Sequence, residues 1–200
     1  VGHSVRNVKE TVRMAAMDDS IRTALLDYRL VAGSDTFFSD AEKELEKFLF
    51  YTDADRFIEK KIAEMRSRHA KYGSTVYILE PNVKEGRGGL RDLHTAFWTA
   101  RVKYKCANLV DLRNKGVVSS QTSRAIRHVI SWLLQVRCEL HSLTGKRTDV
   151  LTFELQEQMA ERFRYRTHGK HYGVERFMRA YYMHALSAAR LYDELLEEVD

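Results

Sequence analysis

Apolar residues recur at intervals of three and four along most of this 200-residue chain. This is the spacing of one face of an α-helix, and a helix with an apolar face must bury that face against another element. The most regular stripes lie in the segments 90–104, 119–144 and 173–198. The pattern therefore predicts an all-α fold, a bundle of about seven to eight helices without an internal repeat.

Capping residues predict where the helices begin and end. Asn7 and Glu10 have the spacing of a capping box, Thr52 and Ser119 are expected to cap later helices, and Gly33 is expected to end the second one. The expected helices cover about 8–18, 19–32, 36–50, 53–72, 90–104, 119–144, 153–163 and 173–198, with a short helical turn at 108–114.

Two short segments depart from the helical pattern. Residues 76–79 are apolar but precede Glu80 and Pro81, and helical geometry is disfavoured just before proline, so we expect an extended run there. The chain opens with VGHSVRN, which lacks an initiator methionine and has a strand-like start at residues 2–5. We therefore expect a piece cut from a longer protein.

The composition is that of a soluble globular domain, with 44% hydrophobic and 30% charged residues. No apolar run approaches the roughly 18 residues of a membrane span, and no signal peptide is present. Cys106 and Cys138 form no CxxC pair, which indicates two packed thiols in the reducing cytoplasm. The net charge of +5 favours anionic partners only weakly, because Lys and Arg are spread along the chain as on solvated helix faces.

The sequence contains none of the common catalytic or metal-binding motifs. Its eight histidines form no HExxH, HxH or HD pattern, and there is no GxSxG or P-loop. His168 and His171 flank Lys170 and could contact an anion, although an exposed connecting loop is the simpler interpretation. We predict no catalytic residue and no metal ligand in this chain.

The loop at 80–92, EPNVKEGRGGLRD, differs from the rest of the chain, since it holds three of the ten glycines and the single proline. Gly88 and Gly89 directly precede a helix with Arg91 in its first turn, and the N–H groups at a helix N-terminus attract anions. Lys84 and Arg87 would add positive charge. The candidate phosphate-binding residues are Lys84, Arg87, Gly88, Gly89 and Arg91.

The same loop also has a purely structural interpretation. Glu85 and Asp92 could hold the cations in place or cap the helix, and the glycines could merely permit positive φ angles. The residues expected to shape the loop are Glu80, Pro81, Asn82, Glu85 and Asp92. The residues alone leave both interpretations open.

The stretch VYILEPNVKEGRGGLRDLHTAFWTAR closely resembles the hallmark of the uridylyltransferase/uridylyl-removing enzymes that modify the nitrogen-signalling protein PII. The segments VGHSVRN, RHAKYGSTVYILEPN, VRCELHSLTGKRTDVLTFELQ and VERFMRAYYMHA are also similar to that family, so the resemblance covers nearly the whole chain. It departs at Arg87, where the family pattern has proline or another small residue.

The resemblance implies a longer enzyme that begins with a nucleotidyltransferase core and continues into HD and ACT domains. The paired aspartates of such a core are absent here, since GSDTFF offers only Asp35, and there is no HD pair. Residues 1–6 therefore look like a remnant of the core, and residues 7–200 like the helical domain that follows it. The resemblance implies that Mg²⁺ is bound by residues outside this chain, and that the chain alone is inactive.

By the same resemblance, the loop would face a nucleotide. The implied partners are UTP or another nucleotide, the PII protein, and the enzyme's own core, HD and ACT domains. One alternative is a non-catalytic module that docks PII or the regulatory domains. Another is the equivalent domain of a glutamine synthetase adenylyltransferase, since the sequence does not choose UTP over ATP. Nucleic-acid binding ranks last, because no recognition motif supports it.

Overall fold

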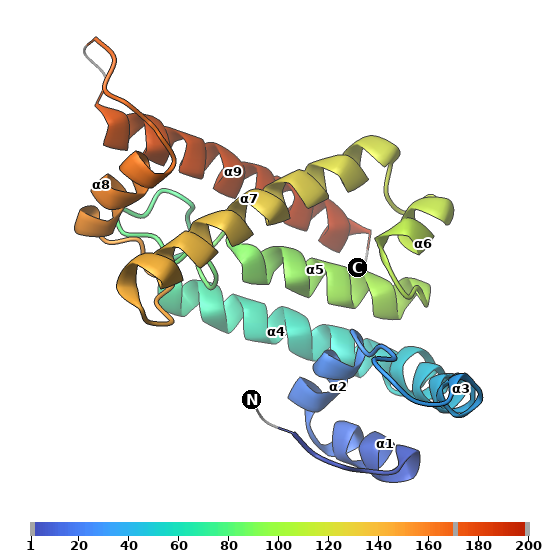
Figure 1. Cartoon of the computed structure of the whole chain (residues 1–200). Coiled ribbons are helices and arrows are strands. Elements are labelled where there is room, and N and C mark those ends of the chain that lie inside the picture. Colours follow the sequence, from blue (N-terminus) through green and yellow to red (C-terminus); the bar gives the residue numbers. More distant parts are fainter. Residues whose placement is uncertain (1–2, 170–171, 199–200) are drawn as a thin grey trace.

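Helices account for nearly all regular secondary structure in this computed structural model, which describes residues 3–169 and 172–198. These residues form α1 (Val8–Met17), α2 (Asp19–Leu25), α3 (Asp35–Tyr51), α4 (Ala54–Tyr72), α5 (Leu90–Tyr104), α6 (Leu109–Asn114), α7 (Ser120–Thr144), α8 (Phe153–Arg162) and α9 (Gly173–Glu197) (Figure 1). The all-α prediction is confirmed. The β-bridge whose two partners both lie in the described ranges joins Asn82 and Val150 in antiparallel orientation.

Several predicted helix boundaries are confirmed by their caps. The Asn7 side chain accepts the Glu10 N–H at 2.9 Å at the start of α1, and the Ser119 hydroxyl accepts the Thr122 N–H at 2.9 Å at the start of α7. Gly73 ends α4 with a φ of 102°. Each of these caps pairs a backbone group that the helix end leaves without an intrahelical partner.

Other boundary predictions are wrong. The second helix ends at Leu25 and not near Gly33. The buried Arg101 guanidinium binds the Leu26 carbonyl and the Asp27 carboxylate, and these contacts favour a non-helical backbone after Leu25. Thr52 does not cap α4, because the N-cap of α4 is Asp53 and Thr52 instead ends α3, where its N–H donates to the Phe48 carbonyl. Residues 76–79 are non-helical as expected, but they pair with no strand in the described structure.

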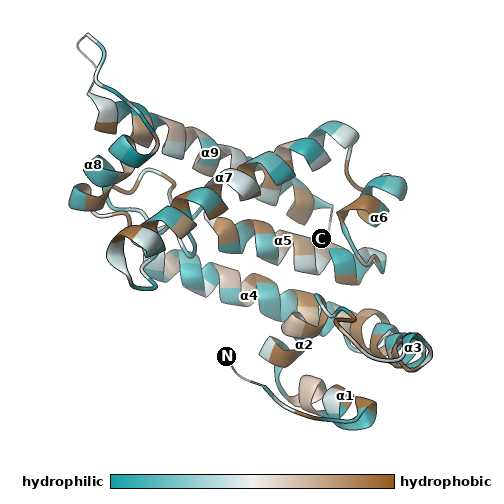
Figure 2. Ribbon diagram, viewed as in Figure 1, coloured by the Kyte–Doolittle hydropathy of each residue, from teal (hydrophilic) through white to brown (hydrophobic). Residues whose placement is uncertain are grey.

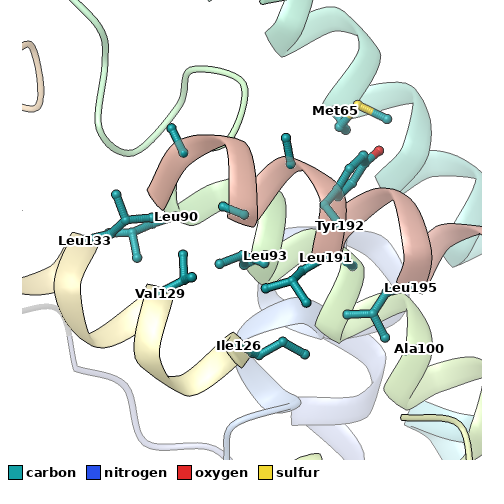
Figure 3. Close-up of a cluster of buried hydrophobic side chains, with 14 of the residues drawn as sticks. Met65, Leu90, Leu93, Ala100, Ile126, Val129, Leu133, Leu191, Tyr192 and Leu195 are labelled. Atoms are coloured by element: carbon teal, nitrogen blue, oxygen red, sulfur yellow. The ribbon is translucent and has the colours of Figure 1, made fainter. Parts of the chain in front are cut away.

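The core is built around α5, which packs against α4, α7 and α9 (Figure 1). Along each of these helices, apolar residues lie mainly on one side and polar residues on the other (Figure 2). Figure 3 shows side chains of α5, α7 and α9 that meet in this core: Leu90, Leu93, Ala100, Ile126, Val129, Leu133, Leu191, Tyr192 and Leu195. The last turns of α4 and the first turns of α5 therefore share a rigid support.

No helix in the described ranges is long and apolar enough to cross a membrane.

A buried arginine of α2 helps to attach the N-terminal helices to this core. The Arg22 guanidinium donates to the Leu49 carbonyl at 2.9 Å at the end of α3. It also lies over the Phe48 and Phe57 rings, with its central carbon 5.1 and 4.7 Å from their centroids. Cations bind favourably to aromatic faces in such desolvated positions. Arg22 thereby holds α2 beside α4.

Candidate functional site

The backbone of the 80–92 loop is fixed by its own polar groups and by the segment that precedes α8. The Asn82 side chain accepts the N–H groups of Lys84 and Glu85 at 3.1 and 2.7 Å, which closes a tight turn. The Val83 N–H donates to the Asp149 carbonyl at 2.8 Å. Two further ties reach the start of α8: the Leu151 N–H donates to the Pro81 carbonyl at 2.9 Å, and the Phe153 N–H donates to the Glu80 carboxylate at 2.9 Å.

The N–H groups that were expected to meet an anion are already paired. At the start of α5, the Leu90 N–H donates to the Val83 carbonyl at 3.1 Å, and the Arg91 N–H donates to the Lys84 carbonyl at 2.8 Å. The preceding Gly89 N–H is paired as well, with the Gly86 carbonyl at 2.9 Å. The helix N-terminus is therefore capped by its own loop. An anion that binds here would contact side chains.

Gly88 and Gly89 bring parts of the chain close together. Gly88 has a φ of +74°, and a Cβ placed on it would lie 2.2 Å from the Ala185 carbonyl oxygen of α9. A Cβ on Gly89 would lie 2.8 Å from the carbonyl oxygens of both Gly86 and Lys84. The space that glycine leaves at these positions is filled by the protein's own backbone, which explains the glycines without a ligand.

Asp92 holds the loop against α4. Its fully buried carboxylate accepts hydrogen bonds from the Arg68 guanidinium, from His69 Nε2 at 2.8 Å and from the Gly88 N–H at 2.8 Å. The sequence analysis had not paired Arg68 and His69 with the loop. One feature of the sequence could have suggested this pairing: Arg68 and His69 lie about one helical turn before Gly73, which ends α4. A buried carboxylate with three donors fixes the start of α5 in one position.

The structure brings together two of the three predicted loop cations. Lys84 Nζ lies 3.0 Å and Arg91 Nη2 lies 3.6 Å from the same Glu85 oxygen. Arg87 lies apart, because its guanidinium binds the Asp193 carboxylate of α9 at 3.0 and 3.3 Å. Lys84 and Arg91 therefore form one cationic surface around Glu85, and Arg87 belongs to the contact between the loop and α9.

A second set of charged residues adjoins this surface: Arg137 and His141 of α7, and Asp149 in the segment after α7. The Asp149 carboxylate accepts from Arg137 Nε at 2.6 Å and from His141 Nε2 at 3.1 Å. Burial raises the pKa of Asp149, but the hydrogen bonds from Arg137 and His141 and the nearby charge of Lys84 outweigh it and hold the pKa below the ordinary value. The Asp149 carboxylate is therefore ionised and carries a negative charge near Lys84.

Arg91 and Arg137 lie close enough to act on the same histidine. Burial lowers the pKa of His94, and the positive charges of Arg91 and then Arg137 lower it further. We use the name loop site for Lys84, Glu85, Arg91, Arg137, His141 and Asp149. The three α7-side members were not predicted, although the i, i+4 spacing of Arg137 and His141 places both on one helix face and could have been noticed.

The described residues contain no group of three or more His, Cys, Asp or Glu side chains that could hold a metal ion. That the Mg²⁺ of the longer enzyme is bound by residues outside this chain stays a prediction. Cys106 is buried and Cys138 is exposed, both as free thiols. Of the three basic residues singled out near 170, His168 is exposed, whereas Lys170 and His171 lie outside the described residues.

Fold and site together define a class: an all-α domain that presents a rigidly held cationic loop. Residues 56–196 match the family described as GlnD PII-uridylyltransferase. The chain belongs to this family, as its sequence motifs had indicated.

Curated relatives support the same assignment. The chain is 38% identical over 191 residues to the bifunctional uridylyltransferase/uridylyl-removing enzyme of Rhodopseudomonas palustris, covering 96% of this chain and 21% of that protein. The protein of the same name in Erythrobacter litoralis is 38% identical over 200 residues, covering 100% of this chain and 22% of that protein. The chain thus spans about a fifth of the length of these relatives. No solved structure matches the chain.

Proposed function

We propose that this chain is the helical substrate-binding domain of a nucleotidyltransferase that transfers a uridylyl group from UTP to the PII protein. The proposal is supported by the family and by relatives that are named uridylyltransferases. In this proposal the loop site contacts the phosphate groups of the nucleotide. The partners are UTP, PII, and the nucleotidyltransferase core with the HD and ACT domains of the longer enzyme.

One observation carries the phosphate assignment: Lys84 and Arg91 converge on the single carboxylate of Glu85. Arg137 binds the Asp149 carboxylate at 2.6 Å, and the charge of Lys84 acts on the same carboxylate, so that the loop site holds three permanent cations and two carboxylates. The four side chains Lys84, Arg91, Arg137 and His141 are about 30% exposed and can reach a ligand. Ammonium and guanidinium groups in such an arrangement bind phosphate oxygens through charge-assisted hydrogen bonds.

Catalysis requires groups that the described residues do not supply. Phosphoryl-type transfer by this class of enzyme uses Mg²⁺ to neutralise charge on the phosphates. In our proposal the carboxylates that bind Mg²⁺ lie outside this chain, which by itself is inactive. Lys84 and Arg91 bind and orient the phosphate groups, and Gly88 and Gly89 shape the loop that carries these cations. Arg87 contributes less, because Asp193 already engages it.

Replacing Lys84 or Arg91 with alanine in the full-length enzyme is expected to lower kcat/KM for UTP about ten- to a hundredfold. Each loss would remove one charge-assisted contact, which is worth about 1.5–3 kcal/mol. The melting temperature should change little, because the ion pairs that break lie near the surface. Steady-state kinetics and thermal melts of the same preparations check both parts.

Arg87→Ala is the matched control, since it removes the same kind of charge from the same loop but from a side chain that faces α9. It should leave kcat/KM within about threefold of the wild-type value, which is less than 1 kcal/mol. Wild-type kinetics in both Lys84→Ala and Arg91→Ala would contradict the phosphate assignment. A docking role for the domain, with a purely structural loop, would then be the better account.

A further inference from the structure

A groove of ≈ 610 Å³ lies between α2, α4 and α5, beside the loop site. Volumes of this size are typical of small-molecule sites. Three helices and the loop contribute its lining, which includes Ser20, Ala24, Arg68, Glu85, Arg91 and Trp98. Neither Lys84 nor any residue of α7 lines it, so the groove and the loop site are adjacent and share only Glu85 and Arg91.

The wall of the groove contains a buried hydrogen-bond donor without an acceptor. Arg68 uses its terminal nitrogen to bind Asp92, but its Nε is buried and has no hydrogen-bond acceptor in the described chain. The Glu85 carboxylate lies 3.9 Å from Nε, which is too far for a hydrogen bond. Most buried donors in proteins are paired, so this one marks a place where a ligand oxygen would be favourable.

The other wall contains an aromatic ring with a cation over one of its faces. The central carbon of the Arg91 guanidinium lies 5.5 Å from the centre of the Trp98 ring, and Trp98 is half-buried. Aromatic side chains of this kind can stack on any nucleobase, because every base has a π-face. Arg91 is thus shared, since it approaches Glu85 in the loop site and Trp98 in the groove.

We infer that the groove between α2, α4 and α5 binds the base and ribose of the nucleotide, with Trp98 against the base and Arg68 Nε donating to a ligand oxygen. The inference rests on the proposed function, since it assumes that the phosphates occupy the loop site. It adds that α2 belongs to the binding site. Ser20 and Ala24 of α2 line the groove together with Trp98.

Intrinsic fluorescence of the purified chain tests the inference, because the sequence has two tryptophans. Trp132 is stacked on His184 at 4.1 Å within the contact between α7 and α9 and does not line the groove. Titration with UTP should change the emission, and the change should vanish in Trp98→Phe but persist in Trp132→Phe. Inorganic tripolyphosphate, which has no base, should bind without this change.

A larger side chain on α2 that fills the groove provides an independent test of the inference. Ala24 is exposed on the groove wall, so Ala24→Phe is expected to fold normally and to occupy the space for the base. Its affinity for UTP should fall about tenfold while its affinity for tripolyphosphate stays unchanged, because stacking a base contributes binding energy that the phosphates do not. Circular dichroism establishes that the variant is folded.

The outcomes separate this inference from the proposed function. Equal dissociation constants for UTP and tripolyphosphate, with no effect of Ala24→Phe, would overturn the groove assignment and leave the phosphate contacts standing. Tripolyphosphate binding that does not depend on Lys84 would overturn the proposed function. Failure of both ligands to bind would overturn both.

Discussion

Replacing Asp92 with alanine is expected to lower the free energy of unfolding by about 3–5 kcal/mol, the largest loss that we expect from one side chain. The carboxylate is fully buried and accepts from Arg68, His69 and the Gly88 N–H. Alanine would leave the Arg68 guanidinium, whose side chain is only 11% exposed, without its carboxylate partner. An unpaired buried charge costs far more than the contact itself contributes.

Urea denaturation of the purified chain measures this loss. The matched control is Asp40→Ala, because Asp40 also pairs with one cation, Lys43, but both side chains are more than 70% exposed. That variant should stay within about 0.5 kcal/mol of the wild type. If Asp92→Ala were as stable as Asp40→Ala, the buried carboxylate could not be what holds the loop to α4.

Gly88→Ala is expected to cost about 2–5 kcal/mol, because two separate penalties add. An L-residue in left-handed geometry costs about 1–2 kcal/mol, and overpacking costs about 1–3 kcal/mol. Both apply at Gly88, where φ is +74° and the new Cβ would lie 2.2 Å from the Ala185 carbonyl oxygen. The expected result is a large loss of stability, measured by thermal and urea unfolding, with α9 displaced from the loop.

Gly116→Ala isolates the backbone penalty. Gly116 has a φ of +77°, close to that of Gly88, but a Cβ there would meet nothing within 4 Å. Its substitution should therefore cost only about 1–2 kcal/mol. Equal losses at the two positions would show that the close approach of α9 to the loop contributes nothing, contrary to our account.

The helices could be predicted from the sequence because their determinants are local. The apolar stripes of α5, α7 and α9 and the caps at Asn7 and Ser119 lie within a few residues of the boundaries that they set. The end of α2 could not be predicted, since it depends on Arg101, which lies 74 and 75 residues from its partners Asp27 and Leu26. The cap of α4 was predicted one residue too early, because Thr52 ends α3 and Asp53, in left-handed geometry, is the N-cap of α4.

The candidate site could be predicted only in part. The composition of the loop shows that it carries cations and glycines, but it does not show which groups they contact. Arg87 carries the same charge as Arg91 and differs only in the partner that the fold provides, Asp193 of α9. Arg137 and His141 join the site because the Val83 N–H pairs with the Asp149 carbonyl, a contact between distant segments. Such pairings follow from tertiary packing and have no local signature.

The most direct test of the central claim, that the loop site contacts phosphate, is to compare the affinities of Lys84→Ala for UTP and for uridine. Lys84 lies in the loop site but does not line the groove. Titration calorimetry should show UTP binding weakened about ten- to a hundredfold and uridine binding unchanged, since uridine has no phosphate. Unchanged UTP affinity, or an equal loss for both ligands, would contradict the account.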